Sequence, residues 1–268
     1  MAETTSGLAA RRVDFSLAAF LGRDSVMGKM GYGYGSEWHL LRHLGYHRAY
    51  LSQKVEEGIG GQGVEWLDFS FSHQNAPLRD DTEFVGLEFI QDPQVQERRK
   101  SFWPQTGNAQ NWDAVARVYA GDTTEWLLIE AKGHVGELES KCGASSRVSQ
   151  QLILSALEKT SKAFGNCRQP IVNWLAPYYQ YANRLAVLYF LMKECVPAVR
   201  TRLLFIYFYG EKREGCECPQ SEQEWIPSIQ EMVDWLGIDK RSELMQRVHY
   251  LFLPVNPSAG VREKGSGR

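Results

Sequence analysis

Residues 126–132 have the sequence Trp-Leu-Leu-Ile-Glu-Ala-Lys, an apolar run that predicts a buried β-strand ending in an acid and a lysine. Side chains two positions apart on a strand share a face. Glu130 and Lys132 therefore point the same way, and Ala131 points into packing on the other side. An acid and a lysine inside an apolar sheet are costly unless they are paired or bind something. The end of this strand is therefore a candidate functional site.

A second acid begins the preceding apolar run. Asp113 lies at the head of residues 112–119, Trp-Asp-Ala-Val-Ala-Arg-Val-Tyr. The spacing of Asp113 and Glu130 suits two adjacent antiparallel strands, and residues 121–124, Gly-Asp-Thr-Thr, supply the turn between them. The pattern predicts that two carboxylates and Lys132 converge at one edge of a sheet.

This set of side chains suits a hard divalent cation. Mg²⁺ prefers carboxylate and carbonyl oxygens, and Asp113, Glu130 and the carbonyl of Ala131 can supply them; Mn²⁺ can substitute. The metal would lower the pKa of a bound water and polarise a phosphoryl oxygen. Lys132 would orient that water or stabilise charge growing on the phosphate.

The arrangement resembles the PD-(D/E)xK nuclease superfamily. In that family an acid on one strand precedes (Asp or Glu)-x-Lys on the next, and the matching residues here are Asp113, Glu130 and Lys132. Trp112 stands where the family often has proline. The resemblance spans roughly residues 36–255. It implies a restriction-endonuclease-like α/β core, with a central mixed β-sheet flanked by helices. It also implies a metal-dependent nuclease that hydrolyses phosphodiester bonds, with DNA favoured over RNA.

Five further residues are candidates for the site. The resemblance implies that Glu37, on the first helix, acts as a third catalytic carboxylate; the alternative is an acid favoured by the helix dipole. His134 is placed to contact substrate phosphate, or is an ordinary loop histidine. Gln150 begins a later helix, where it contacts substrate or is simply polar surface. Gln180 and Arg184 share a helical face and line a substrate groove or the solvent-exposed surface.

The order of elements predicts an α/β protein with a mixed sheet. We expect a long polar connection over residues 91–111, leading into Asp113. Ser36 is the expected N-cap of the first helix. The predicted helices span residues 36–57, 145–164, 177–195 and 222–236. Besides the two motif strands, strands or extended segments are predicted at residues 64–71, 84–90, 201–209 and 248–255.

The length suits one large domain or two small ones, and we expect a cytoplasmic protein. We expect a single nuclease-like domain over residues 13–256, between flexible tails at residues 1–12 and 257–268. Net charge is −2, less basic than most nucleic-acid binders, although an acidic metal site offsets a basic groove. No signal peptide or membrane partner is expected, because the apolar residues 15–21 are too few for a span. Five scattered cysteines suit a reducing compartment.

Two other groups of potential metal ligands have plainer explanations. Cys216 and Cys218 provide two thiols in a turn-rich stretch, short of the four ligands that zinc usually takes. His39, His43 and His47 recur every four residues and are expected to form a polar helix face.

Two functions of different classes remain open at this stage. The first is the metal-dependent nuclease, for which a homodimer or a larger complex would be a suitable assembly. The second is a non-catalytic interaction module on the same fold. In that case Glu130 and Lys132 are a same-face ion pair of little energetic value, and Asp113 is an ordinary strand-start or helix-cap residue.

Overall fold

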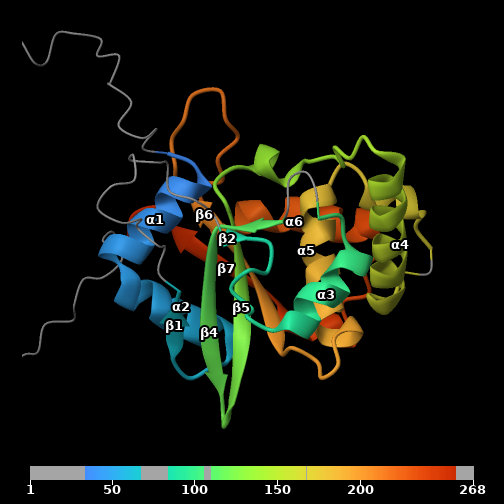
Figure 1. Ribbon diagram of the computed structural model, residues 1–268. Coiled ribbons are helices and arrows are strands. Elements are labelled where there is room, and N and C mark those ends of the chain that lie inside the picture. The colour runs from blue at the N-terminus through green and yellow to red at the C-terminus, as the bar shows by residue number, and fades with distance from the viewer. Residues whose placement is uncertain (1–33, 68–83, 106–109, 167, 258–268) are drawn as a thin grey trace, which may run out of the picture. The chain divides into compact units, whose positions relative to one another are not determined.

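A mixed five-stranded sheet forms the centre of the protein (Figure 1). The computed structural model describes residues 34–67, 84–105, 110–166 and 168–257. Strand order is β1-β4-β5-β6-β7; the first three strands pair antiparallel, and β5, β6 and β7 pair parallel. The strands are β1 (Val64–Trp66), β4 (Ala114–Ala120), β5 (Thr123–Lys132), β6 (Thr201–Tyr209) and β7 (Val248–Pro254). The predicted α/β class and mixed central sheet are confirmed.

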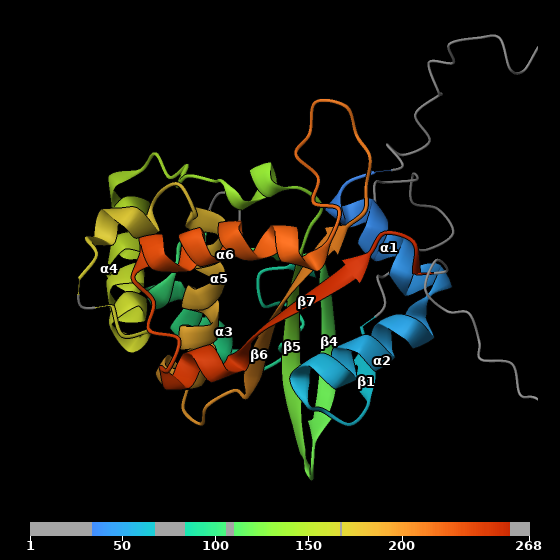
Figure 2. The same cartoon turned by 180° about the vertical axis from the view of Figure 1, so that it is seen from behind.

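Helices pack on both faces of this sheet, as the two views show (Figures 1 and 2). One face carries α1 (Ser36–Tyr46) and α2 (Arg48–Ile59). The opposite core contains residues from α3 (Pro93–Phe102), α4 (Arg147–Ala163), α5 (Tyr179–Tyr189) and α6 (Glu222–Leu236). Along β5, Leu127, Ile129 and Ala131 face the first pair of helices, whereas Leu128 faces the larger core. This alternation directs Glu130 and Lys132 toward the α5 side.

Shorter elements complete the described part of the chain. A small two-stranded sheet joins β2 and β3 across the edge of the larger core. These elements are β2 (Phe84–Val85), β3 (Asn111–Trp112), the 3-10 turns η2 (Val135–Leu138), η3 (Ile171–Trp174) and η5 (Glu243–Arg247), and the π-helical turn η4 (Phe190–Glu194).

The predicted hairpin before the motif is present. Ala114 pairs with Ile129 and Ala120 pairs with Thr123, so two residues close the turn. Gly121 has a φ of 61°, the positive value that a two-residue hairpin loop favours at its first position. The backbone N–H of Asp113 donates to the carbonyl of Ile129 at 3.1 Å. Asp113 therefore lies beside Glu130 on the neighbouring strand.

Four predictions near the N-terminal side of the domain differ from the structure in their boundaries. The single helix expected at residues 36–57 is two helices, which break at His47. Ser36 is the first helical residue rather than the N-cap; Gly35, with a φ of 91°, holds that position. The strand predicted at residues 64–71 ends at Trp66, and its residues 68–71 lie outside the described ranges. Of residues 84–90, only β2 is extended.

The long polar connection predicted at residues 91–111 contains a helix, α3. Pro93 marks its first turn, where the missing N–H of proline costs nothing. The Asp92 side chain caps it by accepting from the N–H of Gln94 at 2.8 Å. Val95 and Phe102 bury its inner side. Residues 106–109 of this segment are not described.

The predicted tails fall almost wholly outside the described ranges, which begin at Tyr34 and end at Pro257. No helix within those ranges has the length and apolar character needed to cross a membrane.

The polar face expected from the spaced histidines is wrong. His39 and His43 are 5% and 0% exposed, and both rings pack against Phe208. Burial lowers the pKa of His43 to about 4, although its hydrogen bond to the His39 carbonyl opposes that shift. The folded protein thus holds His43 neutral at pH values where an unfolded chain would protonate it.

Acid is therefore expected to destabilise the fold through this group. Between pH 6.5 and about 4 the unfolded chain binds the extra proton, so stability falls as pH falls through that window. The loss from His43 alone is about 3 kcal/mol. Urea unfolding at several pH values should show a flatter profile for His43→Leu than for the wild type. Equal slopes for the two proteins would contradict this assignment.

Candidate functional site

The end of β5 carries a compact charged cluster. Lys132 Nζ lies 2.6 Å from Glu130 Oε1, and both side chains are almost fully buried. Asp113 directly precedes β4, the strand that pairs with β5. Its Oδ2 accepts a 2.6 Å hydrogen bond from the N–H of Ala131 on β5. Ala131 itself packs its methyl group into the opposite core. The structure thus brings together the four residues of the predicted motif.

Helix α5 closes the cluster from the other side. Gln180 Oε1 accepts from Lys132 Nζ at 2.8 Å. Arg184 Nε and Nη2 lie 2.9 and 2.8 Å from Glu130 Oε2. The predicted shared face of Gln180 and Arg184 is confirmed, and it packs over the motif strand. Arg184 was expected to contact substrate; its side chain instead neutralises Glu130 and lies over the Trp112 ring at 4.9 Å.

The two carboxylates have opposite electrostatic environments. Burial, reinforced by the charge of Glu130, raises the pKa of Asp113 well above its ordinary value. Burial also acts to raise the pKa of Glu130, but the charges of Arg184 and Lys132 outweigh it and hold that pKa below its ordinary value. Divergent pKa values in a carboxylate pair are a frequent feature of acid–base sites. Among the described residues no ion pair joins Asp113 to a cation, although the charges of Lys132 and Arg184 partly oppose the rise in its pKa.

The members of the cluster differ in their exposure to solvent. Behind Glu130 and Lys132 lies a cavity of about 10 Å³, room for roughly one water molecule. Its other walls are mostly apolar and include Phe205 and Tyr207. Asp113 and Gln180 are only half-buried. A substrate would therefore meet the cluster at these two residues.

Glu37 is on a helix whose start lies next to the end of the motif strand. It is an exposed residue in the first turn of α1. The start of that helix abuts Gly133, because a Cβ placed on Gly133 would come within 3.0 Å of the Ser36 nitrogen. A side chain at position 133 would push α1 away from the end of β5. Glu37 thus belongs to the same edge of the sheet as Lys132.

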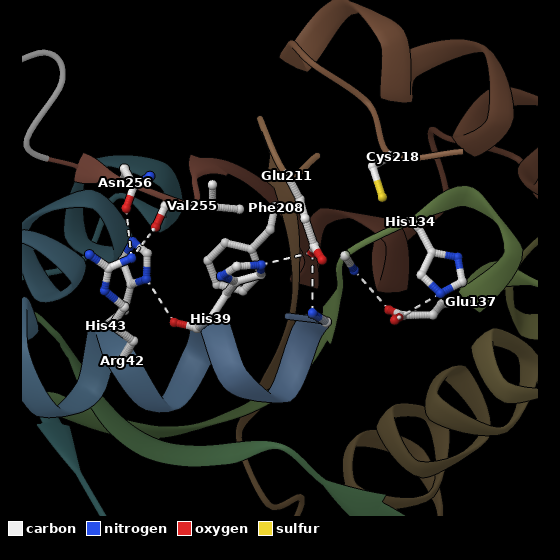
Figure 3. Close-up of polar contacts among 12 residues, drawn as sticks. His39, Arg42, His43, His134, Glu137, Phe208, Glu211, Cys218, Val255 and Asn256 are labelled. Atoms are coloured by element: carbon white, nitrogen blue, oxygen red, sulfur yellow. Dashed lines mark hydrogen bonds and ion pairs between the residues drawn. The ribbon is translucent and has the colours of Figure 1, made fainter. Parts of the chain in front are cut away.

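The other two predicted residues lie apart from the cluster. His134 pairs with Glu137 at 3.3 Å, and Glu137 also accepts from the N–H of Gly133 (Figure 3). Gln150 is exposed, and its amide donates to the carbonyl of Ala144 at 2.8 Å. Within the described residues, no hydrogen bond or ion pair connects either side chain to Asp113, Glu130 or Lys132.

Sequence reasoning missed a second polar group at this edge. Glu211, in the segment after β6, accepts from His39 Nε2 at 2.8 Å and from the N–H of Gly35 at 3.2 Å (Figure 3). These bonds tie the first turn of α1 to the loop that follows β6. The sequence signal was that Glu211 follows the end of the apolar strand Thr201–Tyr209, as Lys132 ends the motif strand.

A buried acid held by two cations occurs elsewhere in the sheet. Glu125, near the start of β5, pairs with Arg202 and with Arg247. Burial raises its pKa, but these arginines lower it below its ordinary value, as at Glu130. Ion pairing alone therefore does not mark a functional site. What distinguishes the Glu130 end is the second carboxylate, Asp113, together with a lysine.

A metal at this cluster would have few protein ligands. In the described parts of the chain, no three His, Cys, Asp or Glu side chains are grouped so as to hold an ion. That composition does not suit zinc or a calcium cage. Mg²⁺ commonly uses one or two carboxylates and keeps several waters, which two acids and a carbonyl can satisfy.

Comparisons with known proteins give no information about this site. The chain matches no protein-family model, and no curated protein or solved structure is significantly similar to it.

Proposed function

We propose that this chain is a Mg²⁺-dependent nuclease that hydrolyses phosphodiester bonds, with DNA as the favoured substrate. The observation that carries the proposal is the convergence of Asp113 and Glu130 from adjacent strands, with Lys132 on the same face as Glu130. An ion pair that only stabilises the fold needs no second carboxylate beside it. Here Asp113 places a second carboxylate next to the pair of Glu130 and Lys132.

The order of elements supports a restriction-endonuclease-like core. A helix leads into the antiparallel meander β1, β4 and β5, and helices α4 and α5 then lead to β6 beside β5. The segment containing β2, α3 and β3 lies between the first and second meander strands as an addition to that plan.

The side chains of the cluster have distinct roles in this proposal. Asp113, Glu130 and the carbonyl of Ala131 would hold the metal, which polarises a phosphoryl oxygen and lowers the pKa of a bound water. Gln180 and Glu130 fix the Lys132 ammonium at the end of β5, where it orients the attacking water or stabilises phosphate charge. Arg184 keeps Glu130 ionised. Glu37 has no part in this metal set, because it does not group with Asp113 and Glu130 among the described residues.

Cleavage assays test the proposal directly. Labelled single- and double-stranded DNA and RNA would be incubated with the full chain and Mg²⁺ or Mn²⁺. Metal-dependent cleavage of DNA is expected, and cleavage of RNA alone would correct the substrate. Absence of cleavage on all four substrates, with no stabilisation by metal, would contradict the proposal.

Metal binding should stabilise the folded protein. At a metal concentration about a hundredfold above Kd, the free energy of unfolding should rise by about 2.7 kcal/mol, measured as a shift in Tm. Asp113→Asn should remove that gain, whereas Asp122→Asn, an exposed acid in the same hairpin, should retain it. Because Asp113 must lose its proton to bind metal, the gain should increase as pH rises.

A non-catalytic interaction module is the second candidate. Glu130 is only 3% exposed and has a cationic partner on each oxygen, as in a purely structural cluster. A module of this kind would show neither cleavage nor stabilisation by metal, and Asp113→Asn would leave its response to Mg²⁺ unchanged.

A further inference from the structure

A separate apolar cavity is lined by residues of α6, of the segment after it and of β7. Its volume is about 370 Å³, within the usual range of small-molecule sites, about 300–1,000 Å³. Its walls are aliphatic and aromatic side chains with few polar groups. The lining residues are Ile226, Ile229, Val233, Met245, Tyr250 and Phe252, with Gln230 and Lys240 as the polar members.

The polar groups of the cavity have unequal freedom to bind a ligand. Tyr250 shares its hydroxyl hydrogen with Tyr181 at 2.5 Å, so it faces inward. Gln230 donates to Asp234 and accepts from the exposed Lys240. Lys240 has no ion-pair partner among the described residues. Of the described residues that line the cavity, it alone is charged.

One apolar residue of the cavity wall is also exposed to solvent. Ile226 is 50% exposed although it lies on α6 beside the cavity. Ile226 therefore extends the apolar wall of the cavity to the protein surface. Lys240 also lines the cavity, so a ligand with a negative charge would be favoured there.

We propose that this cavity binds a small amphipathic acid, with an aliphatic body against the α6 side chains and an anionic head at Lys240. The site lies on different residues from the Asp113 cluster, so it does not depend on nuclease activity. Shape and burial select the aliphatic body, and Lys240 selects a carboxylate over a neutral or cationic head.

Calorimetric titration with decanoate, below its micelle concentration, tests the site in the full chain. Saturable binding to a single site is expected, with decanol binding about tenfold more weakly because it lacks the charge. Lys240→Glu should weaken decanoate binding about tenfold or more and abolish its preference over decanol. Ile226→Asp should weaken both ligands. Both changes are at exposed positions and should leave the fold intact.

Two matched variants separate the cavity from general surface effects. Lys162→Glu reverses an exposed charge on α4, and Val148→Asp replaces an exposed apolar residue there; both should bind decanoate as the wild type does. Equal binding of decanoate and decanol, or binding unaffected by Lys240→Glu, would overturn the assignment. So would absence of decanoate binding together with self-association that Ile226→Asp abolishes, because the groove would then be an interface between copies.

Discussion

Lys132→Met is expected to reduce metal-dependent cleavage by about 10²–10³-fold, the usual cost of removing one group that stabilises transition-state charge. The lysine is held at the end of β5 by Glu130 and Gln180, so its ammonium has a fixed position. A methionine keeps the length and apolar stem of that side chain but removes its charge. Single-turnover rates at saturating Mg²⁺ would measure the loss.

Loss of folding is the competing explanation for such a result, and the cluster allows it to be separated. Glu130 retains Arg184 in the variant, so the buried carboxylate is still paired. We therefore expect Lys132→Met to unfold cooperatively in urea and to remain stabilised by Mg²⁺. Lys141→Met, at an exposed position shortly after the motif, should cleave at the wild-type rate. Wild-type cleavage by Lys132→Met would refute the catalytic role of the lysine.

The sequence predicts the centre of this fold because strand periodicity is local. Residues 126–132 specify which side chains share a face, and the continuous apolar run Thr201–Tyr209 is a strand buried on both faces. The charge cluster follows from the same alternation. Its carboxylates and lysine were predictable because an unpaired acid or base in an apolar strand has a high desolvation cost.

The errors arise where tertiary contacts override local patterns. Helix α3 has few apolar residues, and most of it is exposed; only Val95, Arg99 and Phe102 are buried. His39 and His43 are tolerated in the core because Phe208 covers both rings, a contact more than 160 positions distant along the chain. Arg184 is buried on a helix whose following residues, 185–188, are all apolar. That burial signals a buried acid, but only the packing of α5 on β5 identifies Glu130 as its partner.

Arg184→Met is expected to destabilise the fold by about 3 kcal/mol, because breaking a buried pair leaves Glu130 with one cation. Arg202→Met is the matched control: Glu125 keeps Arg247 there, as Glu130 keeps Lys132. Urea unfolding should show a loss for both variants, smaller for the more exposed Arg202. A loss below about 1 kcal/mol for Arg184→Met would mean that this buried pair contributes no more to stability than a surface ion pair does.

The two arginine variants should differ in their response to metal. Without Arg184, burial of Glu130 is opposed only by Lys132, so its pKa rises and the acid tends to hold a proton. A protonated Glu130 is a poor ligand, and Arg184→Met should therefore lose most of the Mg²⁺-induced gain in Tm. Arg202→Met alters an equivalent pair at the other end of β5 and should keep that gain. Equal gains in Tm for the two variants would mean that metal binding does not need Arg184, and would contradict its role in keeping Glu130 ionised for the metal.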